Sequence, residues 1–358
     1  MVTTHAPKVD TMDSVDTTTT SLDSTPYSYD YDYDELCNKT GVIQFGAIFT
    51  PVFFSIVVIL SIFGNILVLV VLVKFENLKS LTNTFILNLA VSDLFFTASL
   101  PFWAYYNMHG WTLGEHACKI VNFIFCLGFY SSGILLILMT AHRYIAVINP
   151  LSDIVSTTGY YSIVASAIIW VVSILVSSLA FAASKVAESK YCVYADSFWS
   201  LWGIYQQNIL FIITSVVFMF CYTHIMCRLL HPVQRRRNKT LKLIFILMVV
   251  FLIGWVPYNL VIFLQSFSYW PRESDSLAED CQYSKNLDYA LEITRLFAFS
   301  QCCLNPVFYV FVGVKFKTHL KKMLKSLGRK KNNNSFRKRQ NRHTITSVTS
   351  GEEFSEAP

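Results

Sequence analysis

Long runs of apolar residues, interrupted by short polar and charged segments, dominate the sequence. A helix needs about 20 mostly apolar residues to cross a bilayer, because backbone amides in the hydrocarbon can hydrogen-bond only within their own segment. Seven runs meet this requirement. We expect transmembrane helices at residues 40–73, 81–107, 120–142, 154–184, 197–227, 243–271 and 287–314. The predicted fold class is an all-α membrane protein with a seven-transmembrane helix bundle.

The composition excludes a soluble protein of the same length. Of the 358 residues, 53% are hydrophobic and only 15% are charged, and the mean hydropathy is +0.44. So large an apolar fraction needs lipid to cover it. Membrane lipid is therefore one expected partner, and no nucleic-acid partner is expected.

Basic residues are concentrated on one side of the predicted bundle. Most of the 29 lysines and arginines lie at Lys74, Lys79 and Arg143 and within residues 228–242 and 315–342. Lysine and arginine next to a membrane helix are retained in the cytoplasm. The sequence thus predicts a multi-pass plasma-membrane protein with an extracellular N-terminus and a cytoplasmic C-terminus.

The polar segments divide the chain into four parts, namely an acidic extracellular tail at 1–42, the seven-transmembrane bundle at 43–314, an interfacial helix at 315–328 and a Ser/Thr-rich cytoplasmic tail at 329–358. In the third part, Phe316, Leu320 and Leu324 recur at helical spacing among lysines, which predicts an amphipathic eighth helix on the membrane surface. Hydroxyl residues in the last part are candidates for phosphorylation.

The extracellular tail carries an unusual alternation of aromatic and acidic residues. The aromatic positions are Tyr27, Tyr29, Tyr31 and Tyr33, each followed by a polar or acidic residue up to Glu35. A flexible anionic segment steers and wraps basic proteins, so the strip is either a docking segment or an ordinary solvated stretch. Asn38 begins an N-glycosylation sequon, Asn38-Lys39-Thr40.

Four of the nine cysteines fall at or near the predicted outer surface, where disulfides persist. They are Cys37, Cys118, Cys192 and Cys281, and the residues alone allow three pairings. No cysteine or histidine cluster has metal-ligand spacing, and catalytic motifs such as HExxH or GxSxG are absent from the sequence. We therefore expect no metal site of that kind and no enzymatic activity.

Asp93 is the only charge in the second apolar run. A carboxylate at the centre of a bilayer costs at least about 2.5 kcal/mol, so it needs polar partners, water or an ion. The polar candidates are Asn65, Ser132 and Asn305. Two interpretations stay open: a sodium ion held among Asp93, Ser132 and Asn305, or a hydrogen-bonded structural aspartate. Sodium is the one cofactor that the sequence suggests.

Arg143 closes the third run at the cytoplasmic border. It either extends to the lipid headgroups or changes partners when helices move. Pro257 and Pro306 each remove a hydrogen bond from a membrane helix and weaken it there. A two-state transmitter needs such weak points between its outer and inner ends. A transporter is less compatible with the sequence, because repeated halves are not evident.

The runs carry, in order, short motifs that together resemble rhodopsin-like G protein-coupled receptors. These motifs are Gly64-Asn65, Leu89-Ala90-Val91-Ser92-Asp93, Cys118, His142-Arg143-Tyr144, Trp170, Trp255-Val256-Pro257 and Asn305-Pro306-Val307-Phe308-Tyr309. Within this class the chain is similar to chemokine receptors. That likeness is based on the tyrosine strip, the outer pair Cys37 and Cys281, Ser99-Leu100-Pro101-Phe102-Trp103, and Ser300-Gln301-Cys302-Cys303. Within this family the chain resembles the lymphotactin (XC chemokine) receptors at His142-Arg143-Tyr144, at Arg295 and at Phe311-Val312-Gly313-Val314-Lys315-Phe316.

The resemblance implies a role for each matching position. Disulfides would join Cys118 to Cys192 and Cys37 to Cys281. The four tail tyrosines would be sulfated and contact a basic chemokine. The chemokine's N-terminus would enter a cavity lined by Trp103, Phe125, Tyr258, Glu292 and Arg295. The coupling and switch residues for a heterotrimeric G protein would be Arg143, Tyr144, Tyr222, Trp255, Pro257, Asn305, Pro306 and Tyr309.

The resemblance further implies coupling of the Gi type, calcium mobilisation and chemotaxis, with arrestin and receptor kinases acting on the cytoplasmic tail. Among the departures from the usual chemokine receptor pattern, His142 replaces Asp, Arg295 replaces Glu, Gln301 replaces His and Gly254 replaces Cys. His142 removes the carboxylate that would hold Arg143 inactive. An atypical scavenging receptor without G protein coupling is therefore the alternative function.

Overall fold

The computed structural model describes residues 37–78, 80–148, 159–187, 190–229, 238–269, 277–312 and 318–322. Its α-helices are α2 (Thr40–Phe75), α3 (Leu81–His109), α4 (Gly114–Ile148), α6 (Gly159–Ala183), α7 (Ser197–Leu229), α8 (Asn238–Ser266), α9 (Leu277–Phe299) and α10 (Gln301–Val312). Two strands, β1 (Ser184–Ala187) and β2 (Tyr191–Tyr194), and a 3-10 turn, Phe267–Tyr269, complete the elements. The chain divides into two compact units, Met1–Phe308 and Tyr309–Pro358.

Six helices of the described part are long and apolar enough to cross a membrane, which confirms the predicted membrane helices there. They are Thr40–Phe75, Leu81–His109, Gly114–Ile148, Tyr160–Ala183, Ser197–Ile225 and Val249–Tyr269. Large apolar side chains such as Ile59 and Phe63 on α2 are exposed, at 67% and 70%. Such faces are suited to lipid contact, since soluble proteins rarely expose a contiguous surface of large apolar side chains.

The seventh predicted helix differs from the expectation of one continuous segment at 287–314. The structure has α9 and α10 there, separated at Ser300, and α9 begins earlier than expected, at Leu277. Pro306 has no N–H to donate to the carbonyl of Cys302 one turn earlier. Ser61 and Asn65 on α2 donate to that carbonyl instead, at 3.2 and 3.0 Å. Neighbouring side chains thus satisfy the group that proline frees.

The third predicted helix, 120–142, is too short at both ends, because α4 spans Gly114–Ile148. Charged residues mark the membrane border but do not end a helix. Glu115 and Lys119 form an ion pair one turn apart, at 2.6 Å, which supports the additional outer turn of α4.

An antiparallel hairpin of β1 and β2 follows α6, and the sequence reading did not predict it. The predicted fourth run extends to residue 184, whereas α6 ends at Ala183 and Ser184 begins β1. Val186 pairs with Cys192 across the hairpin. Tyr191, Val193 and Tyr194 are residue types that favour strands and could have indicated it.

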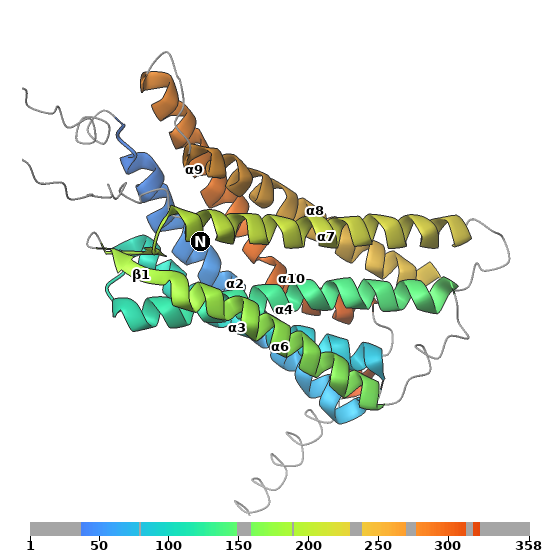
Figure 1. Ribbon diagram of the computed structural model, residues 1–358. Coiled ribbons are helices and arrows are strands. Elements are labelled where there is room, and N and C mark those ends of the chain that lie inside the picture. The colour runs from blue at the N-terminus through green and yellow to red at the C-terminus, as the bar shows by residue number, and fades with distance from the viewer. Residues whose placement is uncertain are drawn as a thin grey trace, which may run out of the picture. The chain divides into compact units, whose positions relative to one another are not determined.

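Helix α4 is the central element of the bundle: it packs against α3, α6 and α7 (Figure 1). The approach of α3 to α4 is close at Gly128, where a Cβ would lie 2.4 Å from the backbone nitrogen of Phe96. Only glycine fits there. Of the expected amphipathic eighth helix, residues 318–322 are helical, and the remainder lies outside the described residues.

Candidate functional site

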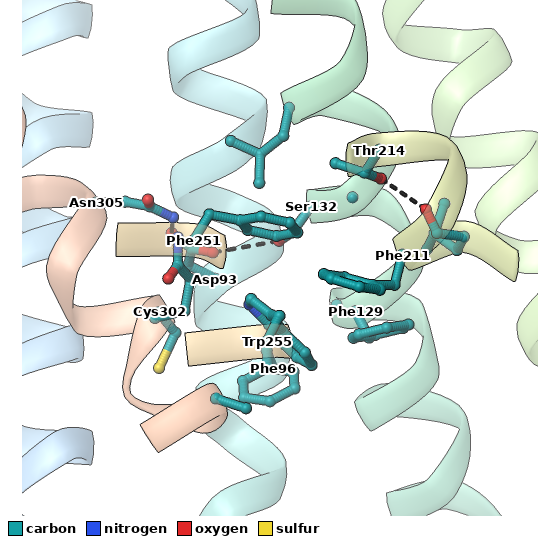
Figure 2. Close-up of a pocket in the computed structure, with 16 residues that line it drawn as sticks. Asp93, Phe96, Phe129, Ser132, Phe211, Thr214, Phe251, Trp255, Cys302 and Asn305 are labelled. Carbon is teal, nitrogen blue, oxygen red and sulfur yellow. Dashed lines mark hydrogen bonds between the residues drawn. The ribbon is translucent and has the colours of Figure 1, made fainter. Parts of the chain in front are cut away.

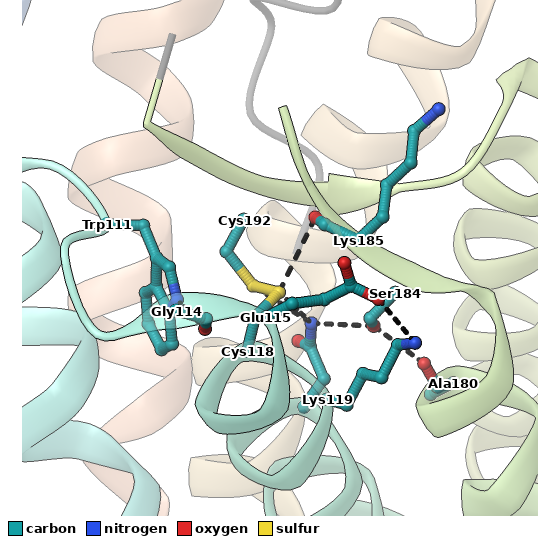
Figure 3. The surroundings of a disulfide bond; sticks show 10 residues. Trp111, Gly114, Glu115, Cys118, Lys119, Ala180, Ser184, Lys185 and Cys192 are labelled. Atoms are coloured by element: carbon teal, nitrogen blue, oxygen red, sulfur yellow. Dashed lines mark hydrogen bonds and ion pairs between the residues drawn. A yellow bond between two sulfur atoms is a disulfide. The ribbon is translucent and has the colours of Figure 1, made fainter. Parts of the chain in front are cut away.

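The Cys118–Cys192 disulfide, one of the two pairs that the resemblance implied, ties the hairpin to α4 (Figure 3). Asn122, one turn below Cys118, donates a hydrogen bond to the Ser184 hydroxyl at 2.9 Å. The backbone N–H of Trp111 donates to the carbonyl of Lys190 at 2.7 Å. The α3–α4 connection, the outer end of α4 and the hairpin are therefore held together. Sequence reasoning missed Asn122, whose polarity near Cys118 was the available signal.

The second implied disulfide, Cys37–Cys281, is also present and joins the residues before α2 to the first turns of α9. Beside it, the Asn38 side chain accepts a hydrogen bond from the backbone N–H of Thr40 at 2.9 Å and is exposed. The sequon thus lies on an accessible surface. The four tail tyrosines lie outside the described residues.

Glu292 and Arg295 form an ion pair within one turn of α9. Arg295 is 4% exposed, and its Nη2 lies 3.5 Å from Asn107 Oδ1 of α3. Thr50 on α2 donates to Glu292 at 3.2 Å. The Nε atom of Arg295 is buried without a hydrogen-bond partner among the described residues. A buried donor of this kind is costly unless a further acceptor reaches it.

Trp103, Phe125 and Tyr258 are buried, with 0%, 1% and 2% exposure. Trp103 and Phe125 contact each other edge to face, with ring centroids 6.3 Å apart. These three residues therefore form the packed floor beneath the outer end of the bundle. An entering ligand would have to move aromatic side chains to reach them.

Aromatic contacts continue from this floor toward the bundle centre. Phe125 contacts Phe299 at 5.3 Å, and Phe299 contacts Tyr258 at 5.7 Å. Trp255 contacts Tyr258 at 5.8 Å and Phe129 at 5.2 Å. The rings come from α4, α8 and α9, so they form a continuous series of packing contacts among these three helices.

The three residues proposed for a sodium site meet at the centre (Figure 2). Ser132 and Asn305 donate to the two carboxylate oxygens of Asp93, at 3.2 and 2.8 Å. They line a cavity of about 40 Å³, which also contacts Trp255. One water needs roughly 10–15 Å³, so the cavity has room for a cation with water.

Two further buried polar atoms belong to residues that line this cavity. Asn305 Oδ1 and Gln301 Nε2 are buried and have no hydrogen-bond partner in the described part of the chain. The Asp93 carboxylate, the Ser132 hydroxyl and the Asn305 carbonyl are oxygen donors of the kind that hard cations prefer. These donors fit a sodium ion. Gln301 was noticed in the sequence only as a departure, and its position at the cavity could not be read from it.

The proposed inner switch is described only in part. Trp255 and Pro257 lie on α8, and Pro306 lies on α10. Tyr144 contacts Phe220 of α7 at 5.8 Å, which places it between α4 and α7. Tyr222 lies on the same helix as Phe220. The side chains of Arg143 and Tyr309 lie outside the described residues.

Comparison with known proteins agrees with this geometry. Residues 64–309 match the family described as 7 transmembrane receptor (rhodopsin family). The chain is 42% identical to the Homo sapiens Chemokine XC receptor 1, over 85% of this chain and 89% of that protein. The Mus musculus Chemokine XC receptor 1 is 40% identical, over 86% and 92%. The Homo sapiens C-C chemokine receptor type 4 is 35% identical, over 88% and 89%.

Proposed function

This chain belongs to the chemokine receptors of the rhodopsin family, and from that membership we propose that it signals the binding of a lymphotactin-like C chemokine to a Gi-type heterotrimeric G protein. It is a non-enzymatic, multi-pass receptor of the plasma membrane, with chemokines and G proteins as the partners of its family. The observation that carries the choice of ligand is the 42% identity to a chemokine XC receptor over 85% of the chain.

The first stage is capture of the chemokine by the extracellular tail. Tyr27, Tyr29, Tyr31 and Tyr33 alternate with acidic residues, and sulfation, which fits the family, adds further negative charge. Opposite charges accelerate encounter, and a flexible segment gains order only on contact with its partner. The Cys37–Cys281 disulfide ends this segment beside α9, so a captured chemokine is delivered to the outer end of the bundle.

In the second stage the chemokine's N-terminus approaches the Glu292–Arg295 pair. A ligand anion would supply the acceptor that Arg295 Nε lacks. Trp103 and Phe125 lie in the packed floor beneath this region, and their displacement would reach Trp255 through the aromatic contacts. Only a ligand that binds the open arrangement better than the closed one shifts the balance between them.

A sodium ion among Asp93, Ser132 and Asn305 would favour the closed arrangement, because three helices converge on those oxygens. Loss of the ion and movement of α8 at Pro257 would then open the inner end. Arg143, Tyr222 and Tyr309 would form the G protein contacts there, with the N-terminus extracellular and the C-terminus cytoplasmic. Calcium mobilisation and chemotaxis would follow, and arrestin and receptor kinases would act on the cytoplasmic tail.

The alternative is a scavenging receptor that binds chemokine without G protein coupling, and His142 is the observation that favours it. One experiment separates the two functions: purified lymphotactin is added to cells that express the receptor, with calcium and cyclic AMP as readouts and chemokine uptake measured in parallel. The proposal expects a calcium rise and a fall in cyclic AMP. Uptake without either response would favour the scavenger.

Two variants test the mechanism in the same cells. Replacing Tyr29, Tyr31 and Tyr33 by Phe should weaken lymphotactin binding and flatten its dependence on salt. Unchanged affinity would contradict the docking role of the strip. Arg143→Ala should abolish G protein activation at normal surface expression, and full signalling by this variant would contradict its switch role.

A further inference from the structure

A second connection between the tail and the bundle lies beside the Cys37–Cys281 disulfide. Lys39 Nζ is 2.9 Å from Asp288 Oδ2 of α9, and the two side chains are only 11% and 7% exposed. The same Nζ donates to the Ser284 hydroxyl at 2.7 Å. A pair this well buried is screened much less by salt than a surface pair. Lys39 is thus fixed to α9 independently of the disulfide.

The electrostatic field at the start of α2 disfavours a cation at the position of Lys39. It is the N-cap of α2, where the helix dipole favours negative charge. The backbone carbonyl of Lys39 accepts hydrogen bonds from Val42 and Ile43, which holds the Lys39 backbone at the start of the helix. The Asp288 carboxylate offsets this local cost, so the pairing depends on the tertiary contact.

Asp288 also contacts α8. Gln265, which is fully buried near the outer end of α8, donates to Asp288 Oδ1 at 3.5 Å, the long limit for such a bond. One carboxylate therefore joins the residue that ends the tail to both α8 and α9. α8 also carries Trp255 and Pro257.

Contacts along the same face of α9 continue toward the ligand-entry region. Cys281, Ser284, Asp288 and Glu292 recur every three or four residues and so share one face of the helix. Tyr289 packs against Gly41, where a Cβ would lie 2.7 Å from its hydroxyl. Thr50 then donates to Glu292 at 3.2 Å. The Lys39–Asp288 pair is thus an ionic contact between the start of α2 and this face of α9.

We propose that Lys39 and Asp288 are positioning residues that couple the chemokine-binding tail to α8, so that the pair determines how efficiently chemokine binding activates the receptor. The part of this inference that concerns chemokine binding depends on the proposed function. The disulfide holds Cys37 against α9, and the ion pair holds Lys39, two residues later, against Asp288, which also contacts Gln265 of α8. Binding of the chemokine to the tail does not itself require the Lys39–Asp288 ion pair.

The variants Lys39→Met, Asp288→Asn and the charge swap Lys39→Asp/Asp288→Lys test this inference. Lys39→Met keeps the Asn38 sequon. Lys285→Met is the matched control, since it removes a lysine from the same region of α9 that has no ion pair in the described part of the structure. Thr40→Ala controls for loss of the glycan. Full-length receptor is expressed in cells, and all responses are normalised to surface expression.

The ligand arm compares lymphotactin binding with G protein activation. Both single variants should need about tenfold more lymphotactin for half-maximal activation, with the binding constant changed less than about threefold, because buried charge pairs couple strongly. The swap should recover most of the loss. Equal losses in binding and activation, or a swap no better than the singles, would overturn the coupling role, since a merely structural defect gives that result.

A ligand-free arm keeps the inference separate from the choice of chemokine. The Cys37–Cys281 disulfide is opened with a mild reductant, and the freed thiols are trapped by alkylation. Lys39→Met and Asp288→Asn should open about tenfold faster than the wild type and the Lys285→Met control, because local opening frees the tail. Unchanged opening rates would overturn the inference. If the disulfide opens faster in the two variants but the receptor does not respond to lymphotactin, the ligand assignment is wrong and the coupling role of the pair still stands.

Discussion

The side-chain amide of Asn65 donates a 3.0 Å hydrogen bond to the backbone carbonyl of Cys302, although the residues are 237 positions apart in the sequence. The carbonyl is available because Pro306, one turn later, has no N–H. Ser61 donates to it as well. Helix α2, near the start of the chain, and helix α10, near its end, are thus joined at the point where Pro306 weakens α10.

Asn65→Ala should lower the thermal stability of the purified receptor. Interhelical hydrogen bonds in membranes are worth about 0.6 to 2 kcal/mol, and Ser61 still serves the Cys302 carbonyl, so a loss near 1 kcal/mol is expected. Thermal denaturation in detergent measures it. Asn83→Ala is the control, because the hydrogen bonds of Asn83 are local, to Glu76 and Asn77. Equal effects of the two variants would contradict the role of Asn65.

Gly128→Ala should nearly abolish surface expression, whereas Gly133→Ala should be tolerated. At Gly128 the new methyl would lie 2.4 Å from the backbone nitrogen of Phe96, which cannot move without separating α3 from α4. At Gly133 it would meet only the end of the Leu210 side chain, at 2.9 Å. Flow cytometry of a tagged receptor measures both. Normal expression of Gly128→Ala would show that the helices are less closely packed.

Asp93→Asn should remove the effect of sodium on lymphotactin affinity. In the wild type, replacing choline chloride by sodium chloride at constant ionic strength should weaken binding by about tenfold, within the usual range of allosteric coupling. The amide keeps the shape of the side chain but not its charge. Ser132→Ala should reduce the effect without removing it. A sodium effect that persists in Asp93→Asn would place the ion elsewhere.

The pair Glu292 and Arg295 can be tested by charge reversal. Arg295→Glu should lower lymphotactin potency by about tenfold or more, because it places two carboxylates side by side where the ligand arrives. The double swap Glu292→Arg/Arg295→Glu restores the ion pair but not the position of the cation. Its potency should therefore stay low. Recovery in the double swap would mean that the pair only stabilises the bundle.

Much of the architecture follows from hydrophobic run length, since six of the expected membrane helices are present, although α4 extends beyond its expected limits at both ends. The seventh is interrupted at Ser300, and just after this break the Cys302 carbonyl that Pro306 leaves free needs donors from elsewhere in the chain. Those donors lie on α2, far away in the sequence. Run length carries no information about such a contact.

In the candidate site, too, the sequence predicts some contacts and gives less information about others. Asp93 is identified from the sequence by its cost in the membrane, and Ser132 and Asn305 do contact it. The buried pair of Lys39 and Asp288 gives a weaker signal, because Lys39 precedes the first apolar run and Asp288 lies at the border of the seventh. The β1–β2 hairpin was missed because its strands are only four residues long and directly follow an apolar helix.

The two disulfides impose an order on biosynthesis. Cys118 and Cys192 are 74 residues apart, whereas Cys37 and Cys281 are 244 apart. The ribosome makes the chain from its N-terminus, so both partners of the Cys118–Cys192 bond are synthesised before Cys281, the native partner of Cys37. A premature bond from Cys37 to Cys118 or Cys192 would have to be exchanged later by thiolate attack. Wherever such a premature bond forms, maturation of this receptor would need an oxidoreductase that rearranges bonds as well as one that forms them.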